Sequence, residues 1–476
     1  MLSSRASAVF GALVFLIASS ATQHLQSLSY DELFTVWVSS RPWSEVVPQA
    51  NLDGFTPPLF YLLVKVVASL GLRAEGLRIV PVVFASVAVF VALRACERLF
   101  GASSRVVALL VIPGSAFLYT FSHELRPYSA FLACAFVFLG QIAGPPDSRR
   151  DARAAGAALL STAFSYLGAM LVAIWVFECR SRFSRLRLLM VSAIAAWLSV
   201  PGVAKLIQLV SARAAGAIEW SEALPSARAV LFGLAPMTLS DGVERAGWLA
   251  LGALLVLASG RRADPPLRFL SRVFVGCGAM LFVLNAVVRM GFAPRYFAVL
   301  AAPLLLVIVA VLSRAGRAGR VFAAVFLAVN ITAVVRYLTS EPQPREDWRQ
   351  AMTALWGRLG PDGVLLAFPF HHAAVATLAY TPAMKMGGGY TSRSGPVYWY
   401  EPPATFHGYA FDDLVKLPNA DDALRRIARV SDVCVLSDEP DPAKTAIVFE
   451  ALRRLNGASE LKTGDVRLRA LCRAKG

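Results

Sequence analysis

Long apolar blocks separated by short arginine-rich loops fill most of the chain, and this alternation constrains the fold more than any other feature. Hydrophobic residues make up 57% of the 476 residues, and charged residues make up only 16%. Soluble globular proteins have about 25% charged residues, so the apolar excess is large. Apolar blocks of this length between basic loops predict a polytopic, all-helical membrane protein.

The net charge of +16 comes mostly from arginines in the short loops between the apolar blocks. Membrane proteins concentrate positive charge in their cytoplasmic loops, which accounts for this excess. Nucleic-acid binding would need a clustered basic face with stacking side chains, and the sequence shows no such face. We therefore expect a multi-pass protein of the cytoplasmic (inner) membrane, surrounded by membrane lipids and with no nucleic-acid partner.

The apolar blocks predict about 11 transmembrane helices, with the N-terminus in the cytoplasm and the C-terminus outside. The run at residues 57–70 is shorter than the ~20 residues needed to cross, so we expect it to lie at the interface. Residues 154–177 lie between two basic loops, which favours two short spans hinged near residues 166–168. The other expected spans are residues 6–21, 78–95, one that ends near residue 122, one that ends near residue 146, 188–209, 248–259, 269–288, 296–312 and 321–338.

The composition changes after residue 340, where runs long enough to cross a membrane end. We therefore divide the chain into a transmembrane module at 1–340, with a first outer loop at about 22–77, and an extracytoplasmic domain at 341–476. Short apolar runs bounded by turn residues predict strands, and apolar residues at helical spacing predict amphipathic helices, so this domain is expected to be α/β. The strands are expected at 364–367 and 433–436, and the helices at 348–359 and 443–455.

The six cysteines give little support to metal or redox chemistry. None forms a CxxC pair, so zinc or thioredoxin-type sites are not indicated. Four of them lie in or beside apolar blocks, where cysteine behaves as a small hydrophobic residue. Cys434 and Cys472 lie in the C-terminal domain and could form one disulfide if that domain is extracytoplasmic, a pairing that the sequence leaves open.

Two adjacent acids, Asp31 and Glu32, follow the first apolar block. Carboxylates near lipid are costly, and those retained there often have a function. If Asp31 faces a polar cavity at the outer surface, it is a candidate for proton removal or metal binding. The alternative is a solvated loop or a helix start, since Asp is a good N-cap residue. Asp53 is a third outer acid, in a position more typical of a turn residue.

Residues 123–128 (His-Glu-Leu-Arg-Pro-Tyr) are expected at the outer end of the third span. An imidazole and a carboxylate suit a divalent metal or a general base, and the forked guanidinium of Arg126 suits a phosphate. The alternative is a loop that anchors the chain at the interface. Arg295, followed by Tyr296, lies at another outer boundary, where positive charge runs against the positive-inside rule. Anion binding explains this arginine, and so does snorkelling to the interface.

The order and spacing of these segments resemble the integral-membrane glycosyltransferases of the GT-C superfamily, in the branch of protein mannosyltransferases and aminoarabinose transferases. The resemblance covers about residues 6–340, and the C-terminal domain matches only in position. The matching residues are Asp31-Glu32, Thr56-Pro57-Pro58-Leu59-Phe60-Tyr61, Arg78-Ile79-Val80-Pro81, Arg98-Leu99-Phe100-Gly101, the segment 122–128 and Arg295-Tyr296.

The resemblance implies a GT-C helical bundle that transfers a hexosyl or pentosyl group. The donor would be a sugar on a polyprenyl phosphate, and an acceptor hydroxyl at the outer membrane face would attack it with inversion. By the same resemblance Asp31 is the general base, assisted by Glu32. Some relatives use a divalent metal and others do not, so a metal cofactor stays open. The remaining implied roles are metal or acceptor binding for His123 and Glu124, and substrate binding for Asp53, Arg126, Tyr128, Arg295 and Tyr296, with the two arginines on the lipid phosphate.

Two other classes of function stay open at this point. A multi-span transporter or flippase of a lipid-linked glycan would often show internal repeats and ionisable groups near the bilayer midplane. Here the apolar blocks hold few acids, and the candidate acids gather at one membrane face, which favours an interfacial enzyme. A non-catalytic member of the same fold is the second rival. The sugar is not determined by the sequence, and the acceptor can be a glycan, a lipid or a protein.

Overall fold

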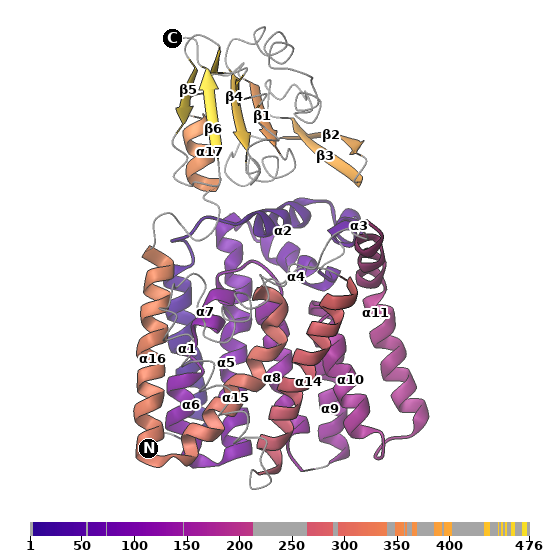
Figure 1. The fold of residues 1–476 in the computed structure, drawn as a ribbon, viewed down its shortest axis with the longest axis vertical. Coiled ribbons are helices and arrows are strands. Elements are labelled where there is room, and N and C mark those ends of the chain that lie inside the picture. Colours follow the sequence, from indigo (N-terminus) through magenta and orange to yellow (C-terminus); the bar gives the residue numbers. More distant parts are fainter. Residues whose placement is uncertain are drawn as a thin grey trace. The chain divides into compact units, whose positions relative to one another are not determined.

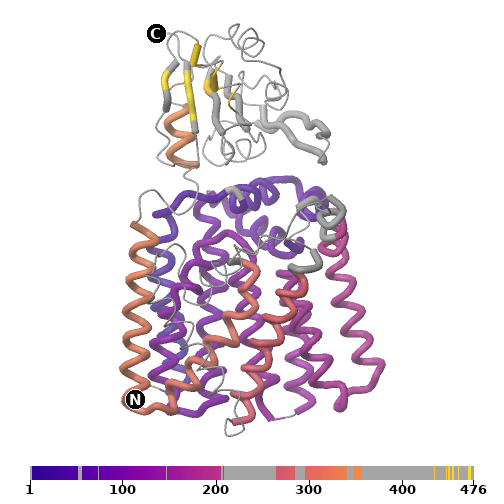
Figure 2. Tube along the Cα trace, in the orientation of Figure 1, coloured from indigo at the N-terminus to yellow at the C-terminus, as the bar shows by residue number. Residues whose placement is uncertain are grey.

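The structure, a computed structural model, describes residues 3–212 except 54, 55, 73 and 146, then residues 264–288 and 294–339, and parts of the C-terminal segment (Figure 2). The expected span at 248–259 lies outside the described residues. Beyond residue 339 the described residues are 348–356, 358, 364–368, 385–392, 395–401, 433–437, 446, 449, 450, 453, 454, 458–461 and 469–473.

Contacts within the chain divide it into two compact units, which we call the membrane unit and the C-terminal unit. The division does not follow the sequence order, because two short pieces from the first outer loop belong to the C-terminal unit. The membrane unit is Met1–Gln23, Arg41–Leu72 and Gly76–Leu338, and the C-terminal unit is His24–Ser40, Arg73–Glu75 and Thr339–Gly476.

Helices make up nearly all of the described membrane unit, and most of them stand upright and side by side (Figure 1). They begin and end where glycine, proline or charged residues interrupt the apolar blocks, as at Gly101, whose φ of 80° is easily adopted only by glycine. In chain order the helices are α1 (Ser4–Thr22), α3 (Trp43–Asp53), α4 (Pro58–Ala68), η1 (Ala74–Arg78), α5 (Ile79–Phe100), η2 (Ala102–Ser104), α6 (Arg105–Val111), α7 (Ala116–Ser122), α8 (Tyr128–Ile142), α9 (Ser148–Phe164), α10 (Gly168–Cys179), α11 (Arg185–Ala212), α14 (Pro265–Val288), η4 (Pro294–Phe297), α15 (Ala298–Arg314) and α16 (Gly316–Thr339).

The core of the bundle lies where α5, α8 and α15 pack on one another. Their facing surfaces are rich in small residues, and a Cβ built on Gly140 of α8 would lie only 2.9 Å from the Cβ of Ala95 on α5. Lipid tails are as apolar as leucine, so helices in a membrane associate through close packing, which small residues permit. This contact therefore fixes α5 against α8.

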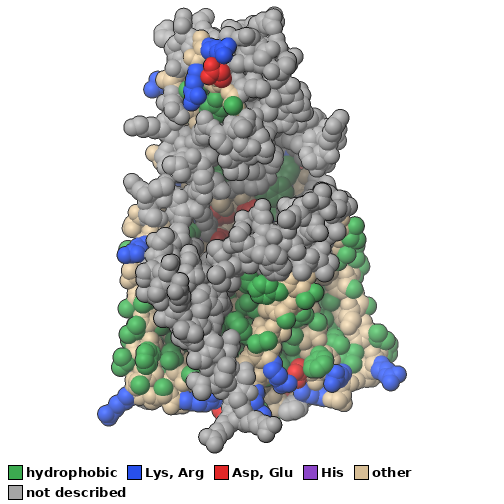
Figure 3. Space-filling model, viewed as in Figure 1, with side chains coloured by type: hydrophobic (Ala, Val, Ile, Leu, Met, Phe, Trp, Pro, Cys, Tyr) green, Lys and Arg blue, Asp and Glu red, His purple; other side chains and the backbone are tan. Residues whose placement is uncertain are grey.

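Peripheral helices of the bundle expose apolar side chains, as expected for contact with lipid. Trp197 of α11 is 73% exposed, and Val321 and Phe322 of α16 are each 63% exposed. An apolar surface this continuous is not stable in water. Figure 3 shows apolar side chains over the membrane unit and lysine and arginine side chains along its lower edge. Exposed arginines at helix ends include Arg98, Arg149, Arg180, Arg187, Arg314 and Arg317.

Six described helices are long and apolar enough to cross a membrane, or seven if the bent pair α6 and α7 counts as one span. That pair is bent by 58°. The helices α4, α8 and α10 are apolar but shorter than 18 residues. These helices indicate a multi-span membrane protein, while the full count of about 11 spans stays a prediction.

The block at 154–177 is divided into two antiparallel helices, α9 and α10, and the break falls at residues 165–167, where a hinge was predicted. At the hinge a Cβ on Gly168 would lie 2.2 Å from the backbone nitrogen of Thr162, so only glycine fits there. At the opposite end Arg182 contacts both carboxylate oxygens of buried Asp151 at 3.1 Å. The Trp175 indole also donates to the Asp151 carbonyl at 2.8 Å, so these contacts lock the two helices together.

The C-terminal unit contains helix α17 (Trp348–Trp356) and two sheets (Figure 1). The larger sheet has the strand order β1-β4-β6-β5; β1 and β4 are parallel, and the other neighbours are antiparallel. A second sheet consists of β2 and β3. The strands are β1 (Val364–Phe368), β2 (Lys385–Ser392), β3 (Gly395–Glu401), β4 (Val433–Ser437), β5 (Ala458–Leu461) and β6 (Arg469–Arg473).

A disulfide joins the two central strands of the larger sheet. Cys434 of β4 and Cys472 of β6 lie directly opposite each other in the antiparallel register, and both are buried. The other four cysteines lie in the helical bundle and are reduced and buried. Structural disulfides persist in oxidising compartments, so this bridge supports an extracytoplasmic location for the sheet.

Removing this disulfide is expected to destabilise the C-terminal unit by about 3–4 kcal/mol, the loss of loop-closure entropy for cysteines 38 residues apart. The measurement is limited proteolysis of the C-terminal unit in full-length protein, for wild type and for the C434S/C472S variant. A reducing agent should accelerate cleavage of the wild type and leave the double variant unchanged. Equal cleavage of oxidised wild type and double variant would contradict a stabilising role.

Candidate functional site

The two candidate catalytic acids, Asp31 and Glu32, lie in the first turn of helix α2 (Tyr30–Ser40), within the C-terminal unit. Glu32 is fully buried, and its Oε2 accepts hydrogen bonds from the backbone N–H of Ser29 at 2.9 Å and from the Ser29 hydroxyl at 3.1 Å. This is the reciprocal half of a capping box, in which an acid three residues into a helix accepts from the residue that precedes it. Glu32 therefore fixes the start of α2.

Asp31 has a different environment in the same turn. Its residue is half-buried, whereas Glu32 has no exposed surface. The Asp31 backbone carbonyl accepts from the Thr35 hydroxyl at 3.1 Å, within the helix. Of the two acids, Asp31 is the more exposed.

The turn between α7 and α8 carries His123, which is buried in the membrane unit. Its Nδ1 lies 3.0 Å from the Ser122 hydroxyl and 2.9 Å from the Tyr119 carbonyl, and its Nε2 lies 3.0 Å from the Thr22 hydroxyl. The Tyr119 ring stacks on the imidazole at 4.4 Å between centroids. Because a carbonyl only accepts, Nδ1 carries a proton, and His123 joins the end of α1 to α7.

These contacts do not suit the metal site expected at His123 and Glu124. A neutral imidazole binds a metal through a ring nitrogen lone pair, and both ring nitrogens of His123 face hydrogen-bonding partners in the protein. In the described part of the chain, no three His, Cys, Asp or Glu side chains gather closely enough to hold a metal ion. Glu124 is half-buried beside this turn. A metal at these residues stays a prediction.

Replacing His123 by Leu is expected to lower the thermal stability of the membrane unit, because it removes the hydrogen bonds that the imidazole makes with the Thr22 hydroxyl and the Tyr119 carbonyl. Each lost hydrogen bond costs about 0.5–1.5 kcal/mol. The measurement is thermal unfolding in detergent, followed by tryptophan fluorescence. T22V should cause a smaller loss, and the two changes should be less than additive when combined. An H123L protein of normal stability whose activity depended on added divalent metal would instead support the metal site.

Arg126 lies in the same turn and is 5% exposed. Its Nη1 donates to the phenol oxygen of Tyr61 at 3.3 Å, and Tyr61 is fully buried on α4. This hydrogen bond joins the segment 56–61 to the segment 122–128, which the family resemblance matched separately. Tyr128 begins α8, is buried, and packs its ring on Phe121 at 4.9 Å between centroids.

The remaining candidates lie on separate elements of the membrane unit. Arg295 is half-buried in η4, with its guanidinium carbon 5.6 Å from the centroid of the Tyr296 ring. That arrangement is a cation–π contact. Asp53 is the last residue of α3, and its side chain lies outside the described residues.

Arg78 is a buried arginine that was not among the predicted site residues. It has no exposed surface, and its Nη1 donates to the backbone carbonyl of Gln23 at 2.8 Å. In the sequence, Arg78 was matched only as part of the family resemblance. Its position at an expected outer span boundary, where positive charge runs against the positive-inside rule as at Arg295, is the signal that could have found it.

Comparisons with known proteins place the fold. No protein-family model and no curated protein match the chain. The crystal structure of ArnT from Cupriavidus metallidurans bound to undecaprenyl phosphate matches with a TM-score of 0.55 and 12% identity, over 98% of this chain and 97% of that chain. The apo crystal structure of the same protein gives a TM-score of 0.48 and 13% identity. Identity this low shows the fold alone, and on the first of these matches the chain shares the fold of that protein.

Proposed function

We propose that the chain is a membrane glycosyltransferase that moves a hexosyl or pentosyl group from a polyprenyl-phosphate donor to an acceptor hydroxyl. The observation that carries the proposal is the agreement of fold over 98% of the chain with ArnT bound to undecaprenyl phosphate. The half-buried acid at the start of α2 adds the chemical group that such a reaction needs. The proposal includes a relation of this chain to the aminoarabinose transferases and protein mannosyltransferases.

In the proposed reaction Asp31 removes the proton from the acceptor hydroxyl as its oxygen attacks the anomeric carbon. The bond from that carbon to the phosphate oxygen breaks, and the polyprenyl phosphate leaves with the bonding electron pair. A single displacement of this kind inverts the anomeric carbon. Glu32 supports Asp31 by holding the first turn of α2, as its bonds to Ser29 indicate. No step uses a metal.

The phosphate of the donor is proposed to bind the arginines of the membrane unit. Arg126 presents a planar fork of N–H donors that matches phosphate oxygens, oriented by the Tyr61 hydroxyl. Arg295, stacked beside Tyr296, is the second phosphate ligand. Tyr128 and Asp53 complete the proposed substrate-binding set.

The reaction is proposed at the outer face of the cytoplasmic membrane. Most of the exposed arginines at helix ends gather at one edge of the membrane unit, and the positive-inside rule assigns that edge to the cytoplasm (Figure 3). The N-terminus would then be cytoplasmic and the C-terminal unit extracytoplasmic. The disulfide between Cys434 and Cys472 supports the same orientation.

The test is transfer by the purified full chain in nanodiscs supplied with undecaprenyl-phosphate sugars. Mass spectrometry of envelope glycolipids and glycans from a strain lacking the gene identifies the acceptor to add. Transfer of the sugar with release of undecaprenyl phosphate is the expected result. A protein that moved the intact lipid-linked glycan between leaflets, with no transfer, would support the flippase alternative and overturn the proposal.

A further inference from the structure

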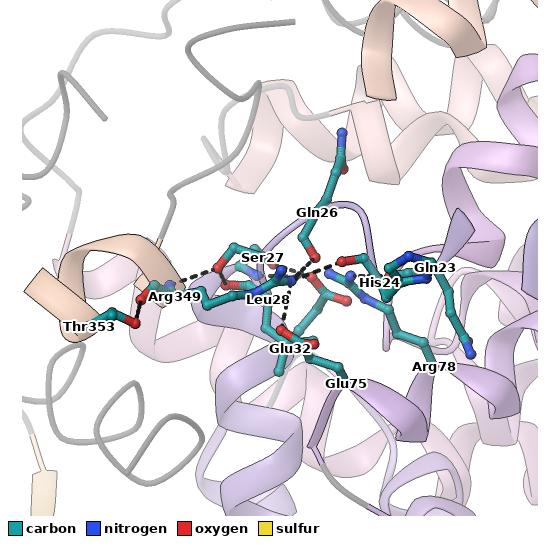
Figure 4. A network of polar contacts seen from close by, with 11 residues as sticks. Gln23, His24, Gln26, Ser27, Leu28, Glu32, Glu75, Arg78, Arg349 and Thr353 are labelled. Carbon is teal, nitrogen blue, oxygen red and sulfur yellow. Dashed lines mark hydrogen bonds and ion pairs between the residues drawn. The ribbon is translucent and has the colours of Figure 1, made fainter. Parts of the chain in front are cut away.

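One side chain, Arg349, holds the segment that leads into helix α2. Arg349 is the second residue of α17, and its backbone N–H donates to the Ser27 hydroxyl at 3.1 Å (Figure 4). The first N–H groups of a helix lack partners within the helix. Here the acceptor comes from a serine 322 residues earlier in the sequence, so Ser27 caps α17 from a distant segment.

The guanidinium of Arg349 makes three further contacts within the C-terminal unit. Its Nη2 lies 3.1 Å from the carbonyl oxygen of His24, 3.0 Å from that of Gln26 and 2.7 Å from Oε1 of Glu75 (Figure 4). The side chains of Arg349 and Glu75 are 39% and 29% exposed, so the ion pair itself adds little stability. Its effect is geometric, because one planar guanidinium on α17 joins residues 24–26 and Glu75 through its Nη2.

Residues 24–29, which Arg349 contacts, form a turn and a loop between helices α1 and α2. Gln26, Ser27 and Leu28 are nevertheless buried. Ser29 follows directly, and it makes the two hydrogen bonds to Glu32 that define the first turn of α2. A continuous path of short contacts therefore runs from Arg349, through residues 24–29, to the turn that carries Asp31.

We infer that Arg349 is a positioning residue for sugar transfer, which sets the orientation of Asp31 through the segment 24–29. This inference rests on the proposed function in one respect, the role of Asp31 as the base. The C-terminal unit then contributes to the reaction, because it holds the loop of the proposed base in its working geometry.

The first arm of the test is steady-state kinetics of full-length R349Q. This variant replaces the charged guanidinium by a shorter, neutral amide. A misplacement of about 1 Å in a reacting group lowers the rate about 10²-fold, so kcat should fall by that order. KM for the polyprenyl-phosphate donor should stay within about 2-fold, since R349Q removes no phosphate contact. R349K, which can keep the ion pair with Glu75, should lie between wild type and R349Q.

Three further variants separate positioning from a loss of folded protein. R358Q changes an exposed arginine in the same unit and should transfer at the wild-type rate. E75Q should lower kcat less than R349Q, because the carbonyls of His24 and Gln26 still hold the guanidinium. R349Q/E75Q should match R349Q alone, since both changes break the same ion pair. An unchanged kcat per folded R349Q molecule would overturn the inference.

The second arm is hydrogen exchange, which needs no catalysis. The amides of Glu32 and Leu33 donate to the Ser29 carbonyl at 3.0 and 2.9 Å, so peptides covering residues 24–36 report on this turn. R349Q should exchange faster there, and R358Q should not. A fall in kcat without faster exchange would also overturn the positioning role. If wild type transferred no sugar at all, the proposed function would fail, while the exchange result would still decide whether Arg349 orders the turn.

Discussion

Replacing Asp31 by Asn is expected to lower the rate of sugar transfer about 10²–10⁴-fold, the usual contribution of a general base. Asn has nearly the same shape but does not accept the acceptor's proton at neutral pH. The change also removes a negative charge from the first turn of α2, where such a charge stabilises a helix by about 0.3–1 kcal/mol. That cost is too small to unfold the protein, so the loss should be chemical.

Two other acids of the same region serve as controls for D31N. E32Q keeps an oxygen that can accept from Ser29, so the capping interaction and most of the activity should survive. E45Q changes the first-turn acid of the neighbouring helix α3 and should transfer like wild type. Rates are compared per folded molecule in nanodiscs. A normal rate for D31N, or a loss confined to E32Q, would remove Asp31 from the mechanism.

The membrane helices were the most predictable part of the fold, because a span needs a long apolar run whatever its neighbours are. The apolar blocks lie in α1, α5, α11, α14, α15 and α16. The break between α9 and α10 also followed from the sequence, since the basic loops on both sides of residues 154–177 require an even number of crossings.

The bend between α6 and α7 was missed, although Pro113 and Gly114 lie between the two helices. The sequence was interpreted as one straight span that ends near residue 122. The helix α2 was also not predicted as such, because a helix start at Asp31 was only one of the alternatives considered. The Ser29 to Glu32 spacing is a capping-box signature and would have predicted the helix start.

Contacts between distant segments could not be predicted from one sequence. Arg349 and His24 are 325 residues apart, and no periodicity or motif connects them. The pairing of Arg126 with Tyr61 spans 65 residues in the same way. For His123 the residue type suggested a metal ligand, and only its neighbours Thr22 and Tyr119 reveal a packing role. Candidate residues follow from chemistry and position, whereas their partners follow from the fold.

Replacing Arg126 by Gln is expected to raise KM for the polyprenyl-phosphate donor about 10–100-fold, because a hydrogen bond to a charged group contributes about 1.5–3 kcal/mol. R126K keeps the charge but loses the planar fork, so its KM should rise less. Y61F removes the hydroxyl that orients the guanidinium at 3.3 Å and should have a smaller effect in the same direction.

The R126Q result distinguishes phosphate binding from simple interface anchoring. Arg336, exposed in the last turn of α16, is the matched control, and R336Q should leave KM unchanged. Direct titration with undecaprenyl phosphate should show weaker binding by R126Q and normal binding by D31N, because the base does not touch the phosphate. If R126Q bound the lipid phosphate normally and lost only thermal stability, Arg126 would be an anchoring residue. The buried position of Arg126 favours the first outcome, since an arginine that only anchors a helix at an interface extends its charge into water.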